Sequence, residues 1–247
     1  KAYGISARTV GYVQGMGFVA GTLLLFMSEE DAFWVLVALL KGANHVPIEG
    51  LYGPGLPLVQ QCLYQFEGLM ADHLPRLSAH FARECIHPSM YASQWFITVF
   101  SYSLPFHVVL RIWDIFMLEG LKIVFQVGIA LLQASEEDLL ALPFEVLAAN
   151  LRHFPCKAPA TPGGNGGGNS ICGDGNGGSS NGDLSLANGR QLGTSHPIGG
   201  GDGGSGGDGA EMDADDLLGR ALLLRLSPRL EELRLEFIGL HAGGESD

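Results

Sequence analysis

Charged residues are scarce in this 247-residue chain, at 16% of the sequence, and basic residues are the scarcer kind, with 14 Lys and Arg against 26 Asp and Glu. The resulting net charge of −12 and the lack of a basic stripe argue against nucleic acid as the main partner. They also argue against electrostatic docking on an anionic membrane. Hydrophobic residues make up 47% of the sequence, so the folded part must bury a sizeable core.

Cysteine is also rare. Cys62, Cys85, Cys156 and Cys172 form no CxxC pair, and no histidine stands at zinc-finger spacing from two of them. This pattern predicts four reduced thiols, as is usual in a cytosolic protein, because disulfides are rare in that compartment.

The signatures of several enzyme classes are missing. The sequence contains no Walker A motif, no dinucleotide-binding glycine fingerprint and no HExxH, so we expect neither a nucleotide hydrolase in its own right nor a bound cofactor. His73, His80 and His87 recur at a regular spacing, but His87 precedes Pro88 and lies outside the predicted helix that holds the other two. We therefore expect no metal site.

The chain also lacks a signal peptide. It begins at Lys1, in mid-pattern and without methionine, which suggests a fragment of a longer protein. The uncharged stretches 9–28 and 85–110 contain glutamine, hydroxyl residues and, in the second, proline, so we interpret them as buried helices rather than membrane spans. These features predict a cytoplasmic protein without a transmembrane segment.

Strand patterns are absent, and helical periodicity runs through most of the chain, so the predicted fold is all-α. Serine followed by acidic residues predicts helix starts at Ser28 and Ser135, Pro75 fits a first helical turn, and Gly42 and Gly120 fit helix ends. The expected helices cover residues 12–27, 32–40, 58–70, 72–84, 90–102, 106–118, 122–133 and 143–154.

The composition divides the chain into four parts. Residues 1–155 form a helical domain, 156–212 a glycine-rich insert that we expect to be disordered, 213–240 further amphipathic helices, and 241–247 a flexible tail. The helices after the insert could act as a tethered partner-binding element. We favour the alternative that they pack back and complete the domain, because long surface insertions cost little free energy.

One short segment near the N-terminus carries a candidate site. In residues 11–16 (GYVQGM), two glycines flank the amide of Gln14, and an apolar run follows. Glycine removes side-chain bulk beside the amide. The amide has both a donor and an acceptor, so it can orient a water molecule while it contacts an anion.

Three segments together resemble one family. Residues 11–16 (GYVQGM), 93–96 (SQWF) and 110–114 (LRIWD), in this order and at these distances, look like the TBC-domain family of Rab GTPase-activating proteins. The similarity covers residues 1–155 and resumes from about 213 to 237, so the chain resembles an N-terminally incomplete copy with a glycine-rich insertion.

The resemblance implies a mechanism and a set of site residues. Such domains stimulate GTP hydrolysis on a GTP-bound Rab by supplying, in trans, an arginine from IxxDxxR and the glutamine of YxQGM. Here that glutamine is Gln14, and Tyr12, Gly15 and Met16 around it would contact the partner. The sequence contains no IxxDxxR, and Arg8 does not match that motif, so the chain resembles half of the catalytic pair.

The remaining motif residues have a structural interpretation. Arg111 and Asp114 lie three positions apart in a predicted helix, where they can form an ion pair. Trp95 and Trp113 stand in strongly apolar helices, where aromatic residues usually pack in the core. We therefore predict that these four residues hold the fold rather than contact the partner.

Three functional hypotheses follow. The first is an activator of a Rab GTPase, associated with endomembranes through its partner, and the second is a catalytically deficient TBC-like module that only binds a Rab. The third is a helical scaffold whose last helices recruit partners. Removal of residues 213–247 would unfold the domain if those helices pack back, and would spare it in the scaffold.

Overall fold

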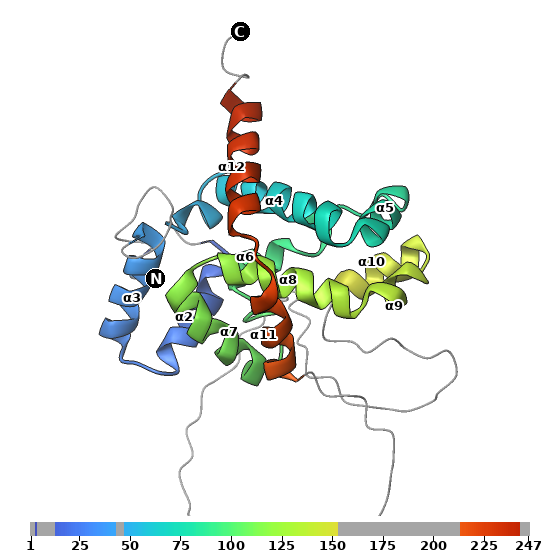
Figure 1. Cartoon of the computed structure of the whole chain (residues 1–247). Helices are drawn as coiled ribbons and strands as arrows, with labels where there is room; N and C mark the ends of the chain where they lie inside the picture. Colours follow the sequence, from blue (N-terminus) through green and yellow to red (C-terminus); the bar gives the residue numbers. More distant parts are fainter. Residues whose placement is uncertain (1–2, 4–12, 43–46, 153–212, 243–247) are drawn as a thin grey trace, which may run out of the picture. The chain divides into compact units, whose positions relative to one another are not determined.

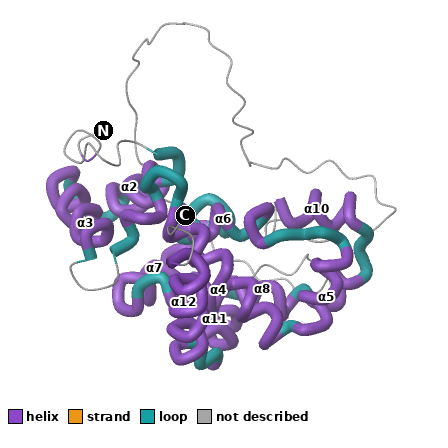
Figure 2. Tube along the Cα trace, turned by 90° about the horizontal axis from the view of Figure 1, so that it is seen from above, coloured by secondary structure: helices purple, strands orange, loops and turns teal. Residues whose placement is uncertain are grey.

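The computed structural model describes residues 3, 13–42, 47–152 and 213–242, and all structural statements concern these residues. Within them the chain is all-α and contains no strand, as predicted (Figures 1 and 2). The α-helices are α2 (Met16–Leu24), α3 (Glu29–Lys41), α4 (Pro57–His73), α5 (Pro75–Arg83), α6 (Ser93–Thr98), α7 (Phe106–Glu119), α8 (Lys122–Ala134), α9 (Glu136–Leu140), α10 (Phe144–Arg152), α11 (Ala214–Leu223) and α12 (Ser227–Ala242). Two 3₁₀ turns, η1 (Glu49–Leu51) and η2 (Pro88–Met90), complete the described elements.

Local sequence signals set several helix ends. The Ser28 hydroxyl accepts a hydrogen bond from the Asp31 backbone N–H at 3.2 Å, which caps α3 as predicted. Gly42 ends α3 with φ of 77°, a left-handed conformation that glycine adopts without steric cost. Pro75 occupies the first turn of α5, where the missing proline N–H costs nothing.

The predicted helix start at Ser135 is confirmed, because α9 begins directly after this residue, but the capping hydrogen bond expected of the serine is absent. Ser135 joins α8 to α9 with φ of −109° and ψ of 10°, and its side chain makes no capping hydrogen bond. Its backbone N–H instead donates to the carbonyls of Leu131 and Leu132 at the end of α8. Ser135 alone therefore joins α8 to α9, and its backbone is not in the extended conformation that a side-chain cap usually adopts.

The segment predicted as one helix over residues 90–102 is broken in the structure. It contains the end of η2 and then α6, which stops at Thr98 because Val99 and Phe100 adopt left-handed backbone angles, with φ of 48° and 60°. Both side chains are fully buried, and the Val99 carbonyl accepts a hydrogen bond from the Trp113 indole at 3.1 Å. Burial and this tertiary hydrogen bond thus outweigh the local preference for helix.

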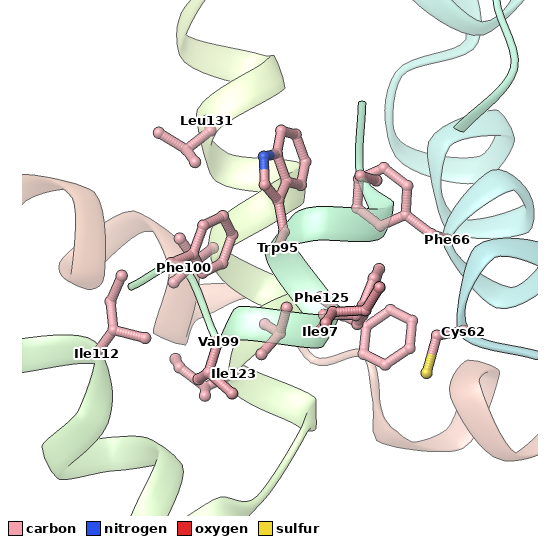
Figure 3. Packing of buried hydrophobic residues seen from close by; sticks show 14 of the residues in the cluster. Cys62, Phe66, Trp95, Ile97, Val99, Phe100, Ile112, Ile123, Phe125 and Leu131 are labelled. Carbon is pink, nitrogen blue, oxygen red and sulfur yellow. The ribbon is translucent and has the colours of Figure 1, made fainter. Parts of the chain in front are cut away.

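Aromatic side chains from α4, α6 and α8 meet in the core (Figure 3). The Phe66 ring stands edge-on to Trp95 with centroids 5.9 Å apart, and Trp95 stacks on Phe100 at 5.5 Å. The rings of Phe96 and Phe125 are tilted at 59° to each other, with centroids 4.8 Å apart. Edge-to-face and offset pairs of this kind stabilise a core beyond the area they bury.

The predicted core role of the motif tryptophans is confirmed. Trp95 and Trp113 are 1% and 5% exposed, and Phe96 and Phe116 are buried with them.

A glycine on α8 allows the close approach of these rings. A Cβ atom at Gly128 would lie 2.8 Å from a ring carbon of Phe66 and 3.3 Å from one of Trp95. Gly128→Ala should therefore destabilise the domain by about 1–3 kcal/mol, the usual range for overpacking, in urea unfolding. The matched control is Gly219→Ala on α11, where a Cβ meets nothing within 4 Å. Gly219→Ala should raise the free energy of unfolding by about 0.5–1 kcal/mol. Equal effects of the two changes would contradict the packing described.

The two helices after residue 212 pack on the helices before residue 153. α11 lies against α8 and α7, and α12 lies against α4 (Figure 1). The Gln65 amide donates to the Leu230 carbonyl at 2.7 Å. Five apolar residues of this segment are buried: Leu217, Leu218, Ala221, Leu226 and Leu233. The prediction that these helices pack back is confirmed.

The predicted disordered insert, 156–212, lies outside the described residues. The predicted tail begins at residue 241, but α12 extends to Ala242.

Candidate functional site

Gln14 occupies the turn directly before α2, and it is exposed. Gly15 follows as the N-cap of α2 with φ of 107° and ψ of −40°, a conformation that residues with a Cβ rarely adopt. A Cβ at Gly15 would also collide with the Ile97 side chain on α6. Glycine at this position therefore brings the turn into direct contact with α6 and leaves the Gln14 side chain outside the core.

The part of α6 beneath this turn is held by a buried tyrosine. The Tyr52 hydroxyl, at the end of η1, donates to the Ile97 carbonyl at 2.8 Å. Tyr52 is 1% exposed, and burial raises the pKa of its phenol, so the group stays protonated and remains a donor. The turn that carries Gln14 thus rests on a fixed backbone segment.

The other residues predicted around Gln14 lie in different environments. Met16 is 4% exposed and belongs to the core, so its side chain anchors α2 inside the domain. A direct contact between the Met16 side chain and a partner would require it to leave that core. Gly15 is a buried residue of the same turn as Gln14. Tyr12 lies outside the described residues.

An exposed aromatic pair stands one helical turn from Gln14. Phe18 on α2 and Tyr102, in the loop before α7, are 41% and 57% exposed, and their rings meet edge to face with centroids 5.3 Å apart. Because the two rings come from different segments of the chain, the contact with Tyr102 helps to hold Phe18 in place, in addition to the backbone of α2. Exposed aromatic side chains are a common feature of surfaces that bind proteins.

Further exposed apolar side chains lie at the end of α2, directly after it and on α3. Leu24, Leu25 and Phe26 are 48%, 66% and 62% exposed, and Trp34 on α3 is 61% exposed. The interpretation of residues 9–28 as a buried helix is therefore wrong for these side chains, which lie on the surface. Several large apolar side chains exposed in one part of a chain are typical of a region that another protein segment covers.

A hollow of about 400 Å³ lies between the end of α2 and α7. Leu23, Phe26 and Met27 line it from the α2 side, and Arg111 and Asp114 are the charged residues of its α7 side.

Arg111 pairs with a different residue from the one predicted. Its guanidinium lies 2.9 Å from an Asp215 carboxylate oxygen, and no ion pair joins Arg111 to Asp114 among the described residues. α11 packs against α7 and brings Asp215 to this position. Both groups are more than half exposed, so the pair contributes little to stability.

The histidines and cysteines do not form a reactive centre in the described part of the chain. His80 is buried and its Nε2 lies 3.2 Å from the Leu142 carbonyl, which is a structural hydrogen bond. Burial raises the pKa of the Cys62 thiol to about 12, so it stays protonated and unreactive. Cys85 is exposed and unpaired by any disulfide. No group of three or more His, Cys, Asp and Glu in the described ranges could hold a metal ion.

No described helix is both long and apolar enough to cross a membrane.

The architecture defines the class of the domain. The crystal structure of a Chlamydomonas flagellar RabGAP TBC domain matches it with a TM-score of 0.51 and 34% sequence identity, over 61% of this chain and 50% of that one. The Ypt/Rab-GAP domain of Gyp1p shares the fold, with a TM-score of 0.54 and 20% identity, over 62% of this chain and 56% of that one.

The RabGAP TBC domain family matches residues 1–156, and the chain belongs to this family. The human ecotropic viral integration site 5 protein homolog is 45% identical over 154 residues, which is 62% of this chain and 18% of that protein. The Caenorhabditis elegans Rab GTPase-activating protein eat-17 is 41% identical over 145 residues, 59% of this chain and 16% of that protein. The chain therefore spans less than a fifth of the length of these relatives.

Proposed function

We propose that this chain acts as a GTPase-activating domain for a Rab-family small GTPase in its GTP-bound form, with Gln14 supplied in trans. One observation carries the proposal: in a chain of the RabGAP TBC family, the glutamine of GYVQGM lies exposed at the turn before α2. Relatives such as eat-17 are named as Rab GTPase-activating proteins.

The chemistry of an exposed amide suits this role. Catalysis of phosphoryl transfer consists mainly of positioning the nucleophile and stabilising developing charge. The carbonyl oxygen of Gln14 would accept a hydrogen bond from the attacking water, and its NH₂ group would donate to a γ-phosphate oxygen. The contact between Gly15 and Ile97 fixes the backbone of the turn, so little of this positioning has to be established on binding.

The arginine of the pair is not found in these 247 residues, because no IxxDxxR occurs in them. The competing proposal is therefore a TBC-like module that binds a Rab without stimulating it. The sequence encoded directly upstream of Lys1 discriminates between the two, since an IxxDxxR there favours the activator. In either case the domain would work in the cytoplasm and meet endomembranes through its partner.

The aromatic pair beside Gln14 gives a test of partner binding. Phe18→Ala removes one half of the exposed pair with Tyr102, and we expect it to weaken binding of the GTP-analogue-loaded Rab about tenfold, as for an exposed aromatic anchor. Affinity is measured by titration of the full chain with a Rab panel, each member loaded with GDP or with a non-hydrolysable GTP analogue.

The matched control is Phe144→Ala on α10, since Phe144 is exposed to the same extent, 41%, and α10 packs against η2. This change should leave the affinity unaltered. Equal loss in both variants, or no preference of the unmodified chain for the GTP-analogue form, would contradict the proposed surface.

A further inference from the structure

The end of α6 supports the turn that carries Gln14, since α6 packs against α2 (Figure 1). The contact is direct, because a Cβ atom on Gly15 would overlap the Cγ2 methyl of Ile97. Ile97 is 7% exposed, so its side chain has little room to move away from the turn. A shift of the Ile97 backbone would therefore displace the support on which the Gln14 turn rests.

The Ile97 carbonyl lacks the donor that a continuing helix would supply. α6 ends at Thr98, and the Ser101 N–H, four residues after Ile97, donates to the Thr98 carbonyl at 3.1 Å instead. A buried carbonyl at a helix end needs a donor from outside the helix. In the part of the chain that the structure describes, this donor is the Tyr52 hydroxyl, at 2.8 Å.

Tyr52 reaches this carbonyl from a segment that is itself anchored. It directly follows η1, which packs against α3 and α4, and its side chain is 1% exposed. The Glu49 carboxylate of η1 accepts hydrogen bonds from the Lys41 ammonium at 2.6 Å and from the Tyr3 hydroxyl at 2.8 Å. The Tyr52 hydroxyl therefore ties the end of α6 to a segment with several fixed contacts.

From this arrangement we infer that Tyr52 is a positioning residue for Gln14. Its hydroxyl holds the Ile97 carbonyl, the Ile97 side chain supports Gly15, and Gly15 sets the backbone from which the Gln14 amide projects. The inference rests on the proposed GTPase-activating function and deepens it. Because phosphoryl transfer depends mainly on positioning and charge stabilisation, a small displacement of this turn slows hydrolysis and leaves the complex intact.

The test is Tyr52→Phe, which removes the hydroxyl and keeps the buried ring. GTP hydrolysis by the Rab is followed in single turnovers with increasing amounts of the chain, extended upstream by a segment that carries IxxDxxR. The maximal rate should fall about tenfold, because a small misplacement near a catalytic group can cost up to about 10²-fold. The concentration that gives half the maximal rate should change less than about twofold. An unchanged maximal rate, or a loss of affinity alone, would overturn the inference.

A double substitution shows whether the effect passes through Gln14. In a Gln14→Ala chain the amide that Tyr52 positions is absent, so Tyr52→Phe should change the remaining rate less than about twofold. An equal loss in both backgrounds would contradict the positioning role. If Gln14→Ala is slow and Tyr52→Phe is not, the role of Tyr52 fails alone. If Gln14→Ala is as fast as the unmodified chain, the proposed function fails, and the role of Tyr52 with it.

The matched control is Tyr91→Phe. Tyr91 is also buried, at 5% exposure, but its hydroxyl donates to the Met70 sulfur of α4 at 3.0 Å rather than to α6. This variant should keep the full maximal rate. A loss as large as that of Tyr52→Phe would show a general loosening of the core and contradict the inference. Thermal melts check that both variants are folded at the assay temperature.

A second variant tests the same support without a change to Tyr52. Ile97→Leu keeps the side-chain volume but removes the methyl on Cβ that faces Gly15. The maximal rate should fall about threefold or more, with the affinity for the Rab retained and with no further effect in a Gln14→Ala chain. A folded Ile97→Leu chain with the full maximal rate would overturn the inference, also where Tyr52→Phe does not fold.

Discussion

Replacement of Gln14 by alanine is expected to lower Rab-stimulated GTP hydrolysis by about 10²–10³-fold, the usual loss when one preorganised polar group is removed from a transition state. The affinity for the GTP-analogue-loaded Rab should change little, because most of the contact surface remains. The measurement is single-turnover hydrolysis with the chain extended upstream by a segment that carries IxxDxxR, so that both catalytic side chains are present.

The control for this variant is Gln133→Ala, which removes an exposed glutamine near the end of α8. It should retain full stimulation. A Gln14→Ala chain that stimulates hydrolysis as well as the unmodified one would remove the glutamine from the mechanism, even if Rab binding is intact.

The second large effect concerns the arginine. The 247-residue chain alone is expected to stimulate hydrolysis weakly, and the extended chain should be faster by about 10³–10⁵-fold, the contribution of an arginine that neutralises charge on the transferred phosphoryl group. Substitution of lysine for that arginine should remove most of the gain, because lysine lacks the planar fork that binds two oxygens. Both chains are compared on the same Rab at saturating concentration.

Full activity in the 247-residue chain would contradict the two-residue mechanism. A chain that stays inactive after the extension, while it still binds the Rab, would support the alternative of a binding module. The measured affinity therefore separates loss of catalysis from loss of the complex.

Local chemistry made much of the fold predictable. Ser28, Gly42 and Pro75 act within one or two turns of the helix ends that they set, so their effect is visible in the sequence. Helical periodicity located most of the helices, including those after residue 212. The break after Thr98 was not predictable in this way, because it depends on the Trp113 indole, which comes from another helix.

The site was predictable only in part. The motif identified Gln14, and the structure places this residue in solvent at a turn. The motif could not show that Met16 is buried or that Phe18 is exposed. The reason is that α2 is apolar on nearly every face, so no periodicity in the sequence reveals which face points to the core. The Arg111–Asp215 ion pair was not predictable either, since the two residues lie on helices separated in the sequence by the glycine-rich stretch.

The most direct measurement is the structure of the complex between the extended chain and its Rab, with GDP and aluminium fluoride in place of the reacting phosphate. We predict that the amide of Gln14 lies within hydrogen-bond distance, about 3 Å, of two atoms. One is the oxygen of the water that faces the aluminium, and the other is a fluoride bound to that aluminium. A complex in which Gln14 points away from the nucleotide, and a side chain of the Rab itself holds that water, would contradict the account.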